Sequence, residues 1–361
     1  MVAYQRVVAG VGHPAATAQE SGGTMTPLNS EKFVDGREAA PTPLHAANAL
    51  PASLHVQVAN DSYGELDVEF DPHDRAYWCF LKPRSSPSYT PGLLQDLIRM
   101  WDSIKRLYDA YAHDGDIPIR YVIGASRIPG IFSYGGDLKL FAELIRSGNR
   151  EELEKYASAC IDVLYRTATS VDLPIVTIAL VQGEALGGGF ESALSCNVIV
   201  AEKSAKFGLP EILFNLFPGM GAYSLLARRL DAIRAEKMIM SGRIYSAEEL
   251  HEIGLIGVLA EDGKGKEAVR EYISRQGRRH GAHRAIYQVR QRVLPLSYAE
   301  LADVTKIWVD TAPRLNEQDL RRMERLAAAQ NRRRTDPDAA NGTREECAPL
   351  SFATGPRIVA D

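Results

Sequence analysis

The feature of this sequence that most constrains its fold is a near-continuous apolar run, residues 175–181, which follows Pro174. Such a run is typical of a strand buried on both faces, because helices then cover both sides of a parallel sheet. A second apolar run, residues 198–201, comes soon afterwards and also favours a strand. The pattern therefore predicts a parallel β-sheet with helices packed against it.

Earlier segments predict more strands and the helices between them. Residues 66–70 alternate in polarity and residues 77–81 are apolar and aromatic, so together they predict a two-stranded hairpin. Residues 120–124 predict another strand. Apolar residues recur at helical spacing over residues 92–112 and 151–169. Strands that alternate with helices predict an α/β fold with βαβ units.

After Gly221 the sequence predicts helices throughout. Leu301 and Trp308 lie on the apolar stripe of one C-terminal helix. Pro313 should break or kink this helix, because proline has no N–H and clashes with the preceding turn. A second helix is then expected to run to about Gln330.

The two ends of the chain differ in composition from its middle. Residues 1–62 are rich in Gly, Ala, Pro, Ser, Thr and His, and residues 331–361 begin with arginines and continue through Pro, Gly, Asn and Asp. Such segments bury too little apolar surface to offset the entropy lost on folding. We therefore expect both ends to be disordered, with one folded body between them.

Composition argues against several kinds of partner. A net charge of −4 over 361 residues leaves no basic excess for nucleic acid. No stretch reaches the ~20 apolar residues of a membrane helix, so no membrane is expected. The four cysteines form neither a CxxC pair nor a metal-ligand spacing. We expect reduced thiols, a cytoplasmic location, and neither a metal nor a cofactor.

Three clusters carry residues suited to chemistry. The first, residues 132–138, follows a strand, precedes a helix and contains Gly135 and Gly136. Paired glycines let a ligand approach backbone N–H groups closely, and the helix adds partial positive charge at its N-terminus. The alternative is a plain strand-to-helix turn.

The second cluster, residues 183–191, holds a triple glycine at 187–189 and ends in Glu191. Ordering three glycines has a high entropic cost, which makes sense where N–H groups must face a ligand oxygen. The alternative is a flexible loop, and the tight apolar flanks argue against it. The spacing does not match a GxGxxG dinucleotide loop.

The third cluster, residues 207–211, ends in Glu211 among apolar neighbours. Burial there would raise the pKa of Glu211 and let it exchange a proton near neutral pH. The alternative is an exposed glutamate at a helix start after Pro210. In combination, two glycine turns can aim one N–H each at a single carbonyl oxygen, forming an oxyanion hole, with two carboxyl groups beside it.

The order and spacing of these clusters resemble the crotonase (enoyl-CoA hydratase-like) superfamily over about residues 62–330. The resemblance implies an α/β spiral fold of ββα units, the ClpP/crotonase-like fold. It further implies a core with the active site over residues 63–260 and a C-terminal helical region over residues 261–330.

The same resemblance implies roles for individual residues. Gly136 and Gly188 would supply the oxyanion-hole N–H groups, and Glu191 and Glu211 would act as acid and base. Many relatives lack one of the two glutamates. Their joint presence therefore implies hydration or dehydration chemistry.

Shorter segments resemble diffusible-signal-factor synthases of the RpfF type more closely; these are residues 180–183, 187–196, 219–224 and 307–312. This resemblance implies an enzyme acting on a 3-hydroxyacyl thioester of acyl carrier protein. Dehydration would give a cis-2-enoyl thioester, and hydrolysis would release a cis-2-unsaturated fatty acid, a quorum-sensing signal. Met220, Trp308 and Leu326 match positions expected to line the acyl pocket, the alternative being ordinary core.

Two other functions stay open at this point. The first alternative is a conventional enoyl-CoA hydratase acting on coenzyme A thioesters. The second is a non-catalytic crotonase-fold protein that binds a regulatory sensor protein. Arg321, Arg322, Arg325 and residues 332–334 could dock an acidic carrier protein, the alternative being a solvated helix face. The crotonase resemblance also implies a homo-oligomer, either a trimer or a hexamer.

Overall fold

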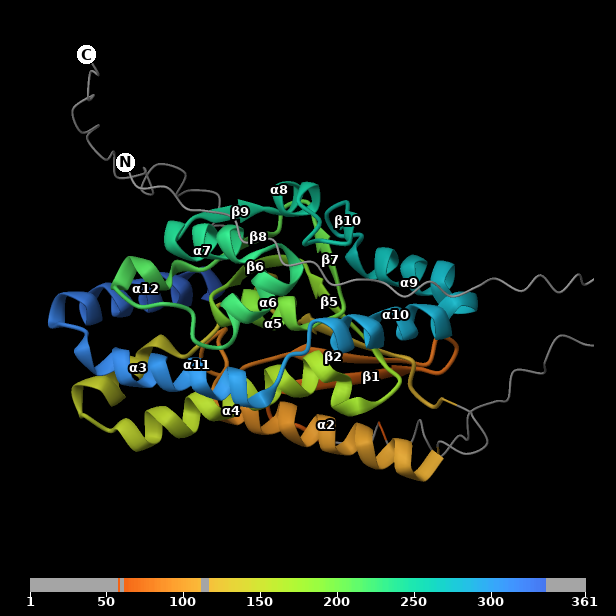
Figure 1. Cartoon of the computed structure of the whole chain (residues 1–361), viewed down its shortest axis with the longest axis horizontal. Helices are drawn as coiled ribbons and strands as arrows, with labels where there is room; N and C mark the ends of the chain where they lie inside the picture. The colour runs from red at the N-terminus through yellow and green to blue at the C-terminus, as the bar shows by residue number, and fades with distance from the viewer. Residues whose placement is uncertain (1–57, 59–61, 112–116, 336–361) are drawn as a thin grey trace, which may run out of the picture. The chain divides into compact units, whose positions relative to one another are not determined.

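The computed structural model describes residue 58, residues 62–111 and residues 117–335 (Figure 1). The disorder expected for the two ends concerns residues that lie almost entirely outside this part of the chain. There are two exceptions, and at both the expectation of disorder is wrong. Val58, in the N-terminal segment, is buried in the main core. The final helix, α12 (Glu317–Thr335), continues five residues beyond the end expected from the sequence.

A six-stranded sheet forms the first layer of the fold. Its order is β1-β2-β3-β5-β7-β10, and all neighbours are parallel except β1 and β2, which form the expected antiparallel hairpin. The strands are β1 (Leu66–Asp71), β2 (Ala76–Leu81), β3 (Tyr121–Ser126), β5 (Val176–Val181), β7 (Val198–Glu202) and β10 (Val258–Ala260). Every residue of β5 is buried, which confirms that the apolar run at 175–181 predicts a strand covered on both faces.

A smaller, four-stranded sheet has the order β4-β6-β8-β9. Its strands are β4 (Gly130–Ser133), β6 (Gly183–Leu186), β8 (Lys206–Gly208) and β9 (Ile244–Ser246). The strands β3, β5 and β7 each continue, after a short turn, into β4, β6 and β8 of this second sheet, and a helical segment follows each pair. This repeat is the ββα unit of the predicted spiral fold, which the structure confirms.

The expectation of helices throughout after Gly221 is wrong. Strand β9 pairs antiparallel with β8, and β10 adds a parallel edge to β7. Both strands have only three residues, too few to show the period of two that identifies a strand. These strands form because β8 and β7, which lie earlier in the chain, have free edges with which they can pair.

Helices account for most of the remaining described residues. They are α2 (Pro91–Tyr111), α3 (Leu138–Arg146), α4 (Arg150–Thr169), α5 (Gly188–Ser195), α6 (Ala222–Arg229), α7 (Ala232–Ser241), α8 (Ala247–Glu252), α9 (Gly265–Gln276), α10 (His280–Val293), α11 (Tyr298–Thr311) and α12. Pro313 lies in a short 3₁₀ turn, Ala312–Arg314, between α11 and α12, so the predicted break is confirmed.

The last two helices return to pack on earlier ones, α11 on α4 and α12 on α3 (Figure 1). Arg146 of α3 pairs with Glu317 and Glu324 of α12, and Arg150 of α4 pairs with Asp310 of α11. Exposed pairs of this kind contribute little each. The apolar contacts of Trp308, Leu320 and Met323 with the main core are the larger stabilising term.

Replacing Gly183 by alanine should disrupt the pairing of β4 with β6. A Cβ at this position would lie 2.0 Å from the carbonyl carbon of Gly130, which is backbone and cannot move aside. We expect the free energy of unfolding, measured by urea denaturation, to fall by about 1–3 kcal/mol. Gly124→Ala is the matched control, because it adds the same methyl to a strand with nothing within 4 Å. Equal effects of the two substitutions would contradict this account.

Candidate active site

The triple glycine forms the turn between β6 and α5. Gly187 has φ +51° and donates its N–H to the Gly208 carbonyl (2.8 Å), and α5 begins at Gly188. A positive φ favours glycine, and a Cβ at Gly187 would also lie 2.5 Å from Glu211 Oε1. The alternative of a flexible loop is therefore wrong, since the turn is hydrogen-bonded to Gly208 and lies in close contact with Glu211.

The first glycine cluster lies directly against this turn. Gly135 has φ +83°, and a Cβ there would lie 2.3 Å from the Gly188 nitrogen. A Cβ at Gly188 would lie 3.4 Å from the Gly136 nitrogen. The amides of Gly136 and Gly188 are thus neighbours, and neither donates to any acceptor among the described residues.

Tyr156 of α4 fixes the position of the first turn. Its hydroxyl accepts the Asp137 N–H (3.1 Å) and donates to the Tyr89 carbonyl, while the Tyr89 N–H donates to the Gly135 carbonyl (2.7 Å). Asp137 in turn caps α3 by accepting the Leu140 N–H (3.1 Å). This chain of bonds holds the Gly136 amide in place, as an oxyanion donor requires.

Glu191 lies one turn into α5 and is 1 % exposed. Its Oε1 accepts the backbone N–H of Ala222 (2.8 Å). Burial raises the pKa of Glu191, and the backbone amides of Ala222, Met220 and Gly221 oppose that rise by stabilising the charged form. Glu191 is therefore a buried carboxyl group whose negative charge is stabilised by backbone N–H groups.

Glu211 lies in the 3₁₀ segment Pro210–Phe214. Its Oε2 is buried and has no hydrogen-bond partner among the residues the structure describes. Burial first, and then the charge of Glu191, raise the pKa of Glu211. The alternative of an exposed glutamate is wrong, because the carboxyl oxygen Oε2 is buried and the residue lines a cavity.

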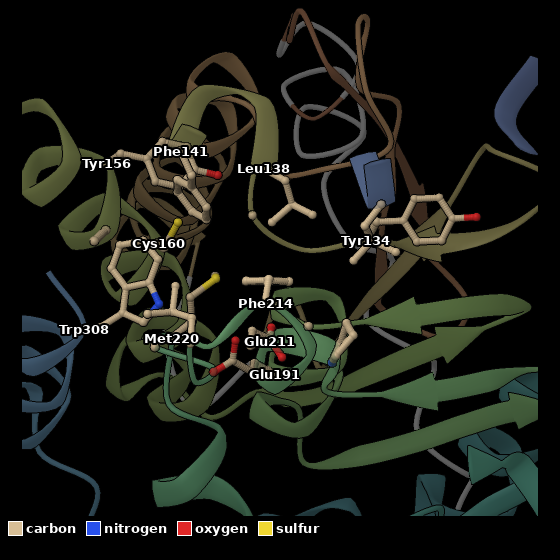
Figure 2. Close-up of a pocket in the computed structure, with 18 of the residues that line it drawn as sticks. Tyr134, Leu138, Phe141, Tyr156, Cys160, Glu191, Glu211, Phe214, Met220 and Trp308 are labelled. Atoms are coloured by element: carbon tan, nitrogen blue, oxygen red, sulfur yellow. The ribbon is translucent and has the colours of Figure 1, made fainter. Parts of the chain in front are cut away.

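The two carboxyl groups differ in what stabilises their charge. Glu191 accepts a backbone N–H, whereas Glu211 Oε2 accepts none and faces the charge of Glu191. Two adjacent buried carboxylates repel each other, so the pair holds one proton over a range of pH. That proton resides mainly on Glu211, which leaves the negative charge on Glu191. Figure 2 shows the two carboxyl groups next to each other.

A single cavity brings together all seven residues singled out from the sequence: Gly136, Gly188, Glu191, Glu211, Met220, Trp308 and Leu326. Its other wall residues are largely apolar or aromatic (Figure 2), and they are Tyr134, Leu138, Phe141, Tyr156, Ala157, Cys160, Gly187, Pro210, Phe214, Leu216, Gly219 and Gln330. Among the residues that the structure describes, no Arg, Lys or His lines this cavity. The catalytic, oxyanion and substrate-binding roles of the seven residues remain predictions.

Aromatic rings make one wall of this cavity continuous. The Phe141 ring packs edge-on to Tyr156, with centroids 5.1 Å apart, and also contacts Trp308 at 5.0 Å. Trp308 lies over Gly219, where a Cβ would come within 2.5 Å of its ring. The sequence showed Tyr156 and Cys160 only as an apolar stripe, since nothing in the periodicity separates core from cavity wall.

The arginines expected to dock a carrier protein lie on the outer face of α12. Arg321 pairs with Glu317 (3.3 Å) and Arg322 lies near Asp319 (3.9 Å), so acidic residues partly neutralise this face. The side chains of Arg333 and Arg334 lie outside the described residues. Carrier docking remains a proposal.

Within the described ranges, no group of His, Cys, Asp and Glu residues has the arrangement of a metal site. No helix in those ranges combines the length and apolar character needed to cross a bilayer. Cys79, Cys160 and Cys196 are buried free thiols.

Comparison with known proteins agrees with the fold. The family model described as enoyl-CoA hydratase/isomerase matches residues 104–283, which include both glycine turns and both glutamates. The mitochondrial methylglutaconyl-CoA hydratase of Rattus norvegicus is 34 % identical over 185 residues, covering 51 % of this chain and 54 % of the rat protein. The chain thus spans about half the length of such curated relatives.

Solved structures share the fold over most of their length. An enoyl-CoA hydratase from Bacillus halodurans matches with a TM-score of 0.60 at 22 % identity, covering 72 % of this chain and 99 % of that one. Pseudomonas aeruginosa DspI matches with a TM-score of 0.54 at 25 % identity, covering 69 % of this chain and 96 % of that one. The chain belongs to the crotonase (enoyl-CoA hydratase/isomerase) superfamily.

Replacing Glu211 by glutamine should stabilise the fold increasingly as the pH rises. Because the folded-state pKa of Glu211 lies above its ordinary value of 4.5, the folded protein binds more protons than the unfolded chain between those two values. Stability is therefore lost as the pH rises through that interval. Glutamine does not ionise, so the gain in the free energy of unfolding should grow from pH ~5 and level off above the raised pKa, at about 1–3 kcal/mol.

Thermal and urea unfolding across this pH range provide the measurement. Glu252→Gln, which neutralises an exposed carboxylate at the end of α8, is the control and should show no such growth. A pH-independent difference between Glu211→Gln and the parent protein would contradict the raised pKa.

Proposed function

We propose that this chain is an enzyme that adds water across, or removes it from, the Cα–Cβ bond of an acyl thioester. The observation that carries the proposal is the convergence of two amides without acceptors and two buried carboxyl groups on one apolar cavity. An acid/base pair beside an oxyanion hole is what proton transfer at the carbon next to a thioester carbonyl requires.

The amides of Gly136 and Gly188 would bind the thioester carbonyl oxygen. Loss of a proton from Cα, or attack of water at Cβ, moves negative charge onto that oxygen as an enolate. Each amide donor in such a hole contributes roughly 3–4 kcal/mol in the transition state. Gly188 is also the first residue of α5, whose N-terminal dipole has the favourable sign for this charge.

The unequal stabilisation of the two carboxyl groups suggests their roles. In hydration, Glu191 as carboxylate takes a proton from the water that attacks Cβ, and protonated Glu211 delivers its proton to Cα. In dehydration the same partners act in reverse: Glu211 removes the α-proton, and Glu191 protonates the β-hydroxyl, which leaves as water. Each glutamate keeps the same carbon or oxygen partner in both directions.

The wall of the cavity favours an uncharged, apolar acyl chain. Apolar surface comes from Phe141, Phe214, Trp308 and Leu326. Within the described ranges, no cationic side chain lines the cavity to receive a second carboxylate. The methylglutaconyl group in the name of the rat relative carries such a carboxylate. Burying that charge without a partner would cost several kcal/mol. We therefore propose a fatty acyl thioester rather than a dicarboxylic one.

A more specific candidate is the synthesis of a cis-2-unsaturated fatty acid signal of the diffusible-signal-factor type. The observation that favours it is the presence of Met220, Trp308 and Leu326 on the cavity wall, at the positions expected for such a synthase. In this version the substrate is 3-hydroxyacyl-ACP in the cytoplasm. After dehydration, water attacks the thioester carbonyl, and the carrier thiol leaves with a proton as the free acid forms. A homo-oligomer and a regulatory sensor partner belong to the same proposal.

Product analysis distinguishes these functions. The full chain is incubated with 3-hydroxydodecanoyl thioesters of coenzyme A and of acyl carrier protein, and the products are identified by mass spectrometry and chromatography. A reversible trans-2-enoyl thioester without free acid supports the conventional hydratase. Free cis-2-enoic acid, formed faster from the carrier-protein thioester, supports the signal synthase. No turnover of either substrate would leave only a non-catalytic binding protein.

Glu191→Gln and Glu211→Gln should each lower kcat for dehydration by at least about 10²-fold, because each removes one half of the acid/base pair. Glutamine keeps the shape of the side chain, so circular dichroism and the unfolding midpoint should show an intact fold. Glu252→Gln should retain parental kcat. A variant at either buried glutamate with full kcat would remove that residue from the mechanism.

A further inference from the structure

A second cavity of about 220 Å³ lies away from the candidate active site and shares no wall residue with it. It is formed where α4, α5, α6 and α10 (Figure 1) approach one another. Leu194 and Ser195 at the C-terminal end of α5 contribute to its wall, whereas the oxyanion turn is at the N-terminal end of that helix. At 1.5 Å per residue the two ends of α5 are about 12 Å apart.

Three arginines line this second cavity, and their guanidinium groups are unequally paired. Arg228 forms a bidentate pair with Glu300, although its Nε is buried without a partner among the described residues. Arg229 donates only to main-chain oxygens, those of Leu194 (2.8 Å) and Cys196.

Arg290 of α10 is the least satisfied of the three. Its side chain donates no hydrogen bond within the described part of the chain, and its ring contact is with Tyr287, whose centroid lies 5.0 Å from the guanidinium carbon. The cavity also has one carboxylate at its rim, the exposed Asp172, which forms no ion pair with any described arginine. Together with Glu300, it leaves an excess of positive charge around the cavity.

This excess is energetically unfavourable in the free protein. Burial, and then the charge of Arg290, lower the pKa of Arg229 to about 10. Burial also lowers the pKa of Arg290. Like charges held together out of water destabilise the fold unless an opposite charge joins them. No described carboxylate does so for Arg229 or Arg290.

We infer that this cavity binds the carboxylate or phosphate group of a small anion between Arg229 and Arg290. A guanidinium group is planar and always charged, and its paired N–H donors match the oxygens of both groups. The remaining wall, which includes Leu194, Leu225, Leu294 and Leu296, would contact a short apolar portion of the ligand. This binding does not depend on the thioester chemistry proposed for the other cavity.

Thermal unfolding of the full chain tests the inference with two probes, inorganic phosphate and butyrate. Each is titrated at constant ionic strength against sodium chloride, since a ligand that binds the folded state raises the unfolding midpoint saturably. The test variant is Arg290→Gln. The matched control is Arg292→Gln, which removes the same charge from an exposed position on the same helix, outside the cavity.

We expect a saturable rise in the parent protein and in Arg292→Gln, and loss of at least half of that rise in Arg290→Gln. A rise with phosphate alone identifies a phosphate site, and a larger rise with butyrate identifies a carboxylate site with an apolar wall. Without either probe, Arg290→Gln should unfold at or above the parental temperature, because repulsion of Arg229 is relieved and no hydrogen bond is lost. Equal rises in both variants, or no rise in the parent protein, would overturn the inference.

Discussion

The direct contact between two glycine turns is the constraint on which the rest of the site depends. Gly135 and Gly188 approach so closely that a single methyl group on Gly135 would overlap the Gly188 nitrogen. The ββα spiral makes this contact possible, because β4 and β6 are adjacent parallel strands and each turn follows one of them. Side chains at either turn would separate the amides, and the site would lose its pair of adjacent donors.

Burial raises the pKa of both glutamates and also makes them unfavourable for the stability of the folded protein. The environment that raises the pKa of both groups leaves Glu211 Oε2 without a donor. Other parts of the fold must offset that cost, and the all-buried strand β5 and the aromatic wall of Phe141, Tyr156 and Trp308 do so. Enzymes commonly have functional sites that lower the stability of the fold.

Much of the fold could be predicted from local patterns, and the rest depends on distant contacts. The runs at 175–181 and 77–81 and the break at Pro313 are local, so periodicity and proline geometry identified them. Strands β9 and β10 have only three residues each. They form by pairing with the edge strands β8 and β7. Glu191 and Glu211 were found as members of motifs. Tyr156, which positions the Gly136 turn through its hydroxyl, was indistinguishable from a core residue, because its partners Tyr89 and Asp137 are remote in sequence.

The central claim is that one thioester oxygen is held by two backbone amides while the glutamate pair faces the neighbouring carbons. A crystal structure of the Glu211→Gln variant with a bound 3-hydroxyacyl thioester measures this directly. The account predicts the carbonyl oxygen within about 2.7–3.1 Å of the nitrogens of both Gly136 and Gly188, Glu191 at the β-hydroxyl, and the side chain at position 211 at Cα. A thioester whose oxygen contacts neither amide, or whose Cα and Cβ lie away from both side chains, would contradict it.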